Sequence, residues 1–156
     1  ILIIWPFLLA MIGSQALLNE VDISQFQKEK VGIVLMNRAS SLDTDRKHQE
    51  SIDDKEHYFP SPAIFVYTLS NIMIGEIAIK HQLKGENACF VSDNFNTELL
   101  YNYVSNLFNK EKIEACIFGW VDFDNGNYES ALALIEKTNR KNITFEVNSI
   151  NHIYKS

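Results

Sequence analysis

The side chains best suited to chemistry are two cysteines, four histidines and several paired carboxylates. Cys89 and Cys116 lie inside apolar runs rather than in a CxxC pair, so we expect both thiols to be reduced and buried. The histidines are scattered, without the spacing of metal ligands. The acidic pairs between positions 43 and 54 lie in a charged stretch, which favours a solvated surface over paired catalytic carboxylates. We therefore predict no metal site and no cofactor.

Two loop motifs also fall short of a binding site. Residues 122–129 alternate acidic and polar side chains as calcium loops do, but the glycine comes one place early. Ala133 stands where the bidentate glutamate belongs, so this segment is interpreted as a plain turn. No glycine-rich phosphate loop follows a predicted strand, which leaves nucleotide binding without support.

Length and composition indicate the kind of domain that must position any site. The 156 residues are 46% hydrophobic and 22% charged, which favours one compact domain. The net charge is −6 and there is no basic run, so we expect neither nucleic acid nor a membrane surface as a partner. Reduced cysteines favour a cytoplasmic location.

The apolar N-terminus is predicted to be a buried helix, not a membrane span. Its uninterrupted stretch covers residues 1–12, shorter than the roughly 20 residues that a bilayer helix needs, and it contains Pro6. We expect a helix from about Pro6 to Leu18, with the proline in its first turn. The absence of an initiator Met and of a basic leader predicts that the sequence begins inside a longer product.

Strands and helices are predicted to alternate along the middle of the chain. Continuous apolar runs predict buried strands at 31–36, 87–91 and 115–121. A helix capped by Ser70 or Asn71 is expected to run to about Leu83, buried, with Gly85 past its end, and helical spacing predicts a second helix over 97–109. This alternation predicts a parallel sheet with right-handed crossovers.

The remaining segments give weaker patterns. Residues 37–59 are interpreted as a charged surface excursion, and 61–69 fits either a strand or a helix that starts at Pro62. Residues 92–96 are expected to form a turn with capping side chains, and Asp124-Asn125-Gly126 a turn after a strand. Residues 129–136 and 143–147 are predicted to be further strands, which add antiparallel pairing.

Several of these segments resemble the β-ketoacyl synthase family. The run Phe59–His81, followed by Lys84-Gly85-Glu86, is similar to the family segment that leads through an amphipathic helix and a K-G-P turn to a strand and the nucleophilic cysteine. Val31–Leu35 resembles the family's G-V-V-L strand, and Ser40–Asp45 the loop after it. Ile113–Trp120 resembles its A-D-x-x-L-A-G-G strand. The resemblance covers positions 31 to 121.

The resemblance implies an α/β fold, the N-terminal half of a thiolase-like condensing enzyme, with a mixed, mostly parallel sheet and helices on its faces. Residues 1–156 would then be a single β-ketoacyl-synthase N-terminal-like domain that lacks its first strand. The family's two catalytic histidines belong to its second half, and His152 does not sit in a matching motif.

The position of the family's nucleophile is the most informative difference. Counted forward from Gly85 or backward from Gly119, the cysteine falls on Asn94 in both cases. The family's T-A-C-A-S/T-G elbow is replaced by residues 92–97, and an amide cannot form the thioester that condensation requires. We therefore assign no catalytic residue. The substrate-pocket candidates are Asp93, Asn94 and Phe95.

The resemblance also implies a partner. In the family, the strand before the nucleophile pairs with its twin across a two-fold axis. The expected assembly is therefore a homodimer, or a heterodimer with a ketosynthase subunit, formed through this strand. Acyl carrier protein is a further expected partner. The dimer-strand candidates are Asn87, Ala88, Cys89, Phe90 and Val91.

The sequence thus favours a non-condensing synthase-like subunit, comparable to chain-length factors, in fatty-acid, polyketide or polyene biosynthesis. One alternative is a residual, decarboxylase-like enzyme that acts on acyl- or malonyl-loaded carrier protein, with the amide of Asn94 at a helix N-terminus polarising the thioester carbonyl. The other alternative is an unrelated α/β binding domain.

Overall fold

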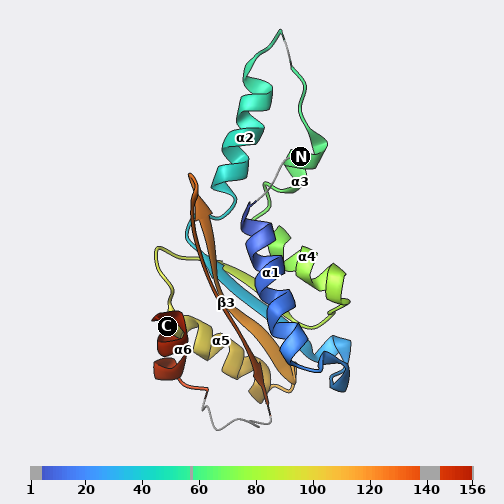
Figure 1. The fold of residues 1–156 in the computed structure, drawn as a ribbon, viewed down its shortest axis with the longest axis vertical. Helices are drawn as coiled ribbons and strands as arrows, with labels where there is room; N and C mark the ends of the chain where they lie inside the picture. The colour runs from blue at the N-terminus through green and yellow to red at the C-terminus, as the bar shows by residue number, and fades with distance from the viewer. Residues whose placement is uncertain (1–4, 57, 138–144, 156) are drawn as a thin grey trace.

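A four-stranded sheet with helices on both faces forms the centre of the computed structural model, which describes residues 5–56, 58–137 and 145–155 (Figure 1). The strand order is β2-β1-β3-β4. The strands are β1 (Val31–Asn37), β2 (Asn87–Val91), β3 (Ala115–Asp124) and β4 (Asn127–Glu136). β1 pairs in parallel with both β2 and β3, and β4 is antiparallel to β3. The predicted mixed, mostly parallel sheet is confirmed.

The central strand β1 is buried on both faces, as its continuous apolar sequence predicts. Val31, Ile33 and Leu35 contribute to the core on one face, while Val34 and Met36 contribute to the core on the other. The period of two residues along a strand produces this division. Each face therefore needs its own cover of helices.

The two faces are covered by different pairs of helices (Figure 1). The helices α1 (Trp5–Glu20) and α4 (Ile72–His81) cover one face, and α5 (Thr97–Asn109) and α6 (Val147–Lys155) cover the other. The chain runs from β1 outward to β2 and then returns past β1 to β3. Because these two crossovers run in opposite directions, crossovers of one hand place α4 and α5 on opposite faces.

The N-terminal helix is found where the sequence predicts it, but it is not fully buried. Ala10, Ser14 and Leu18 face the core, whereas Leu8 and Ile12 are 42% and 59% exposed. The expectation of a wholly buried helix is therefore wrong for α1, because only one side of it meets the sheet. In the part of the chain that the structure describes, no helix combines the length and the apolar character that crossing a membrane requires.

Helix α4 shows the same difference. Met73, Ile74 and Ile77 are buried, but Ile79 is 77% exposed. The helix ends at His81, slightly before the predicted Leu83, and its C-cap is Gln82, which takes a left-handed conformation with φ of 57°. Gly85 has another role, because a Cβ there would lie 2.3 Å from the carbonyl oxygen of Val31.

An arm made of two helices projects from one end of the sheet (Figure 1). Its helices are α2 (Leu42–Asp53) and α3 (Pro62–Val66), and the rings of His48 and Phe65 meet between them at 5.4 Å. The alternative of a helix starting at Pro62 is therefore the observed one. The charged excursion contains α2, a helix that the sequence analysis did not predict. Short 3-10 helices, η1 (Ile23–Gln25) and η2 (Lys28–Lys30), precede β1.

The C-terminal part holds one confirmed strand and one error. A tight turn with positive φ at Asn125 and Gly126 joins β3 to β4, which confirms the predicted strand over 129–136. The predicted strand over 143–147 begins outside the described residues, and Val147 starts the helix α6 instead. Ile150 anchors this helix, being only 2% exposed.

Candidate functional site

The carboxyl ends of the parallel strands are the place where this topology positions a site. From β1 the chain turns one way to β2 and then the other way to β3, so the ends of β1 and β3 mark a switch point. Ligands of open α/β sheets bind in the crevice outside such ends. The segments that meet there are the turn after β1, the loop 92–96 after β2 and the end of β3.

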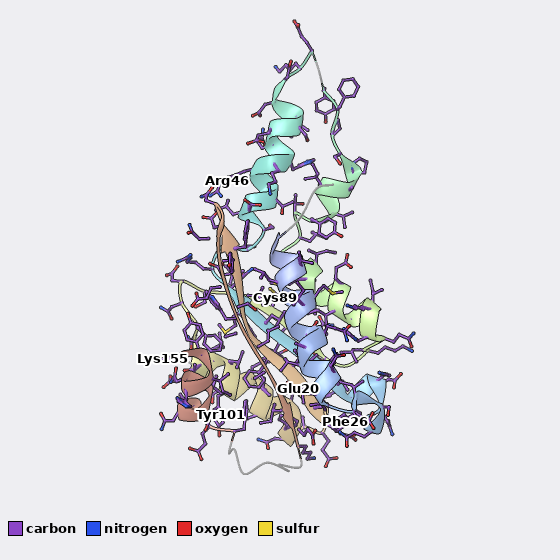
Figure 2. All side chains as sticks on the ribbon, in the orientation of Figure 1. Glu20, Phe26, Arg46, Cys89, Tyr101 and Lys155 are labelled. Carbon is purple, nitrogen blue, oxygen red and sulfur yellow. The ribbon has the colours of Figure 1, made fainter. Side chains whose placement is uncertain are left out.

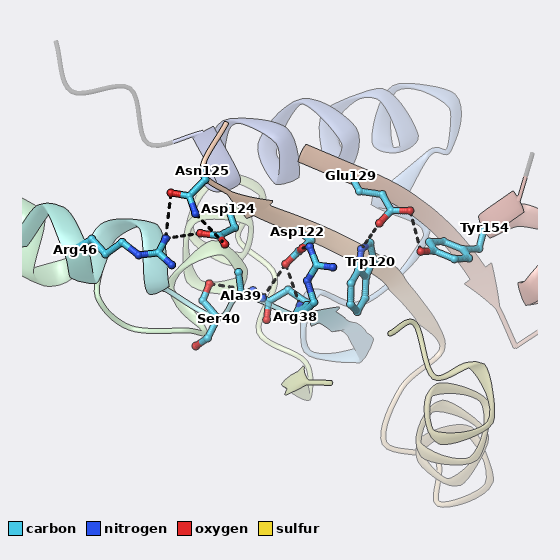
Figure 3. Close-up of polar contacts among 11 residues, drawn as sticks. Arg38, Ala39, Ser40, Arg46, Trp120, Asp122, Asp124, Asn125, Glu129 and Tyr154 are labelled. Carbon is cyan, nitrogen blue, oxygen red and sulfur yellow. Dashed lines mark hydrogen bonds and ion pairs between the residues drawn. The ribbon is translucent and has the colours of Figure 1, made fainter. Parts of the chain in front are cut away.

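A buried carboxylate ties two of these segments together (Figure 3). Asp122, near the end of β3, accepts hydrogen bonds from the backbone N–H groups of Arg38 and Ala39 at 2.9 and 2.8 Å. The Arg38 guanidinium adds an ion pair at 3.0 Å, and only 5% of the Asp122 side chain is exposed. The carboxylate therefore fixes the start of the β1–α2 turn. Its role is structural, and it is not part of a calcium loop.

The loop 92–96 carries the predicted substrate-pocket residues, which differ in their exposure to solvent. The backbone N–H of Ser92 bonds to the Asn37 carbonyl at 2.9 Å, which holds the loop beside β1. Asp93 and Asn94 are exposed, whereas Phe95 is half-buried. Asn96 caps α5 by accepting a hydrogen bond from the Leu99 N–H at 3.0 Å, as a capping turn predicts. Asn94 thus lies two residues before the N-cap of α5.

Phe95 belongs to an aromatic cluster that we define as Phe95, Trp120 and Tyr154. The Phe95 ring lies 4.7 Å from that of Tyr154 and 6.1 Å from that of Trp120. Glu129 on β4 accepts hydrogen bonds from the Trp120 Nε1–H at 3.0 Å and the Tyr154 hydroxyl at 2.8 Å. One carboxylate therefore joins the sheet to α6 beside the loop that holds Asn94.

The ionisation of Tyr154 should weaken this junction at high pH. Burial, the hydrogen bond to Glu129 and the negative charges of Glu129 and Asp122 raise the pKa of Tyr154 from 10.0 to about 12, against an opposing effect of Arg38. Because the folded-state pKa is the higher one, the stabilisation is complete below pH 10 and is lost as the pH rises toward 12. We expect wild type to lose its advantage in Tm over Tyr154→Phe in this window. An advantage that stayed constant up to pH 12 would contradict the assignment.

Neither cysteine has the environment of a nucleophile. Burial raises the pKa of Cys89 to about 11, and its thiol donates to the Ser70 carbonyl at 3.3 Å beneath α1 and α4 (Figure 2). Cys116 is fully buried, and burial raises its pKa as well. Both thiols are free, as predicted, but Cys89 is only partly buried. At neutral pH both remain protonated, the unreactive form.

The predicted dimer strand β2 is an edge strand of the sheet. The hydrogen bonds Ile33 N–H to Glu86 carbonyl and Ser92 N–H to Asn37 carbonyl set its ladder with β1. By the alternation of a parallel ladder, the N–H and carbonyl groups of Asn87, Cys89 and Val91 point to the open side. Val91 is also 55% exposed. Among the described residues no strand pairs with this edge, so it is available to a strand of another chain.

Sequence reasoning missed α6 and the carboxylate Glu129 that holds it. Val147, Ile150 and Tyr154 repeat at helical spacing, a signal that identifies one face of a helix.

A hollow elsewhere on the protein contains none of the predicted site residues. It is lined by Phe26, Lys30, Glu111, Ile113, Glu114 and Lys137. Within the described ranges, no group of three histidine, cysteine or carboxylate side chains is arranged to hold a metal ion.

Comparison with known proteins identifies the fold. No family model and no curated protein matches the sequence. Among solved structures, the ishigamide ketosynthase/chain length factor matches with a TM-score of 0.70 and 20% identity, over 87% of this chain and 44% of that one. A ketosynthase in complex with its chain length factor from Xenorhabdus doucetiae matches with a TM-score of 0.57 and 18% identity, over 77% and 45%. The chain therefore has the α/β fold of a little under half of such a thiolase-like chain.

Proposed function

We propose that this protein is a non-condensing, ketosynthase-like subunit that pairs with an active ketosynthase and works with acyl carrier protein in fatty-acid, polyketide or polyene biosynthesis. One observation carries the proposal. In a fold that matches half of a ketosynthase or chain-length-factor chain, the position assigned to the nucleophile is Asn94, an exposed residue in the loop before α5. We further propose that residues 1–156 correspond to the N-terminal half of such a chain.

The chemistry around Asn94 supports the loss of condensation. A carboxamide cannot attack a thioester and hold the acyl group as a covalent intermediate. Cys89 lies in β2 with its pKa raised to about 11, and Cys116 is buried in β3, so neither thiol replaces the missing nucleophile. The core that shapes the fold is nevertheless intact on both faces of the sheet.

The open edge of β2 supports the pairing. Its outward N–H and carbonyl groups make no ladder bonds with β1, and a second strand placed beside them would satisfy them. Val91, 55% exposed, supplies apolar surface on this strand. The partner that fits is a second copy or a ketosynthase subunit that presents a similar edge.

The exposure of Asn94 gives no support to the alternative of a residual decarboxylase. Polarising a thioester carbonyl requires donors held in a site that excludes water, next to the reacting group. Asn94 is exposed and lies before the N-cap of α5, not in the first turn of that helix. The non-condensing subunit is therefore the function we retain.

A cysteine at position 94 is expected not to restore condensation. Asn94→Cys supplies a thiol, but on an exposed loop without the small-residue elbow. Incubation with acyl-loaded and malonyl-loaded carrier protein, followed by intact-mass measurement, should show no stable acyl adduct and no condensation product above that of Asn94→Ala. A 3-oxoacyl product from Asn94→Cys alone would show that one substitution explains the lost activity, against our account.

A further inference from the structure

The helix α6 covers the sheet face against which Phe95, in the loop 92–96, packs. The ring of Tyr154, near the C-terminus of α6, lies 4.7 Å from the ring of Phe95 in a tilted arrangement, and Phe95 follows Asn94 directly in the sequence. Ile150 inserts between the helix and the sheet. The Tyr154 side chain thus lies beside Phe95 of the loop 92–96, and Figure 3 shows its hydrogen bond to Glu129.

Helix α6 is held weakly enough to detach from the sheet. The helix has nine residues, fewer than an isolated helix needs to be stable in water. Within α6, Ile150 is the single fully buried residue, whereas α5 buries Thr97, Leu100, Val104 and Leu107. Aromatic contacts and Glu129, a residue on the exposed part of β4, also hold the helix. Short elements with few buried contacts open more readily than the core does.

The sheet face on the side of α6 is apolar. Phe90, Met36 and Trp120 lie side by side across β2, β1 and β3, and all three belong to the core on this face. Phe118 lies two residues before Trp120 on the same face of β3. A ligand that took the place of Tyr154 would therefore meet aromatic and aliphatic side chains, which suits a hydrocarbon chain.

We infer that α6 is a movable cover over the sheet and that Glu129 holds it closed. When α6 opens, the acyl chain of a thioester binds against Phe95 and Trp120 in place of Tyr154. This inference rests on the proposed function, which supplies the acyl thioester. The helix and the ligand then exclude each other, and the apparent affinity for the ligand is the intrinsic affinity multiplied by the fraction of molecules with α6 open. No covalent step is involved.

The test compares opening with binding in the whole protein. Glu129→Gln removes the charge and replaces one of the two accepting oxygens with an NH2 donor, so at least one of the two hydrogen bonds is lost and the exchange of the α6 amides with deuterium should rise by about tenfold. Octanoyl-N-acetylcysteamine, a small acyl thioester, should then bind about tenfold more tightly, as followed by Trp120 fluorescence in a Trp5→Phe background. Tyr154→Phe, which keeps the ring, should change both quantities in the same direction. Asn148→Ser, on the exposed side of α6, is the control and should change neither.

Two results would overturn the inference. Faster exchange of α6 without tighter binding of the thioester would mean that the helix does not cover the ligand's site. Binding to none of the variants would mean that no such site exists. Neither result bears on the proposed pairing through β2, because that pairing is measured with variants of Val91. The two proposals can therefore be disproved independently.

Discussion

Asp122→Ala is expected to lower the free energy of unfolding by about 3 kcal/mol, because it leaves two backbone N–H groups without their buried acceptor. For a domain of this size that loss corresponds to a fall in Tm of roughly 6 to 12 °C. The effect should be large because the carboxylate joins segments distant in sequence, the end of β3 and the turn after β1. Chemical denaturation of the purified variant measures it directly.

A neighbouring carboxylate provides the matched control. Asp124 makes an ion pair with Arg46, but the Arg46 and Asp124 side chains are 43% and 27% exposed. Exposed pairs of this kind contribute under about 1 kcal/mol, so Asp124→Ala should change stability little. Equal losses for the two variants would show that Asp122 acts only as a surface charge, contrary to the geometry.

Val91→Pro is expected to weaken association through β2 by about tenfold or more while leaving the fold intact. The N–H of Val91 points away from β1, so proline removes no bond of the ladder within the protein. A strand docked on the open edge would lose one donor and would meet the pyrrolidine ring instead. Native mass spectrometry, of the protein alone and with an active ketosynthase subunit, gives the oligomeric state.

Val91→Thr separates the two causes of any loss. Threonine keeps the N–H group and the β-branched shape, so its dimer should match that of wild type. The circular dichroism spectrum and the Tm of Val91→Pro should also match wild type. If both variants associated as wild type does, the interface would lie elsewhere, for instance on the arm formed by α2 and α3.

The sheet could be predicted because its signals are local and strong. β1 is an unbroken apolar run with both faces buried, and α5 has apolar residues on one side only. The tight turn at Asn125 and Gly126 fixes the β3–β4 hairpin through two positive φ angles. In each case the residues that form the element also specify where it packs.

The arm and the exposed helix faces could not be predicted in the same way. Helix α2 has few apolar residues, so it lacks hydrophobic periodicity, and pairs such as Lys47 with Asp43 at 2.6 Å support it instead. The full burial expected for α1 and α4 was wrong because apolar composition does not say how many sides of a helix find a partner. Ile12 and Ile79 remain exposed for that reason.

Asn94 as the nucleophile-equivalent position stays a prediction, whereas the contacts around its loop could not be predicted. Counting from two glycines placed attention on Asn94, and the loop that holds it does lie at the carboxyl edge of the sheet. The contact of Phe95 with Tyr154 joins residues 59 positions apart, and the carboxylate that supports it lies on a third segment. Local patterns carry no information on such contacts, which tertiary packing alone decides.

The central claim is that the protein has the fold of a condensing subunit but does not perform the acyl chemistry. Native mass spectrometry of the purified protein, mixed with acyl-loaded and malonyl-loaded carrier protein, tests this claim most directly. We expect a dimer, and carriers whose masses are unchanged. An acyl adduct on this chain, or loss of carbon dioxide from the malonyl group, would contradict the claim and would turn attention to Asn94 and Cys89.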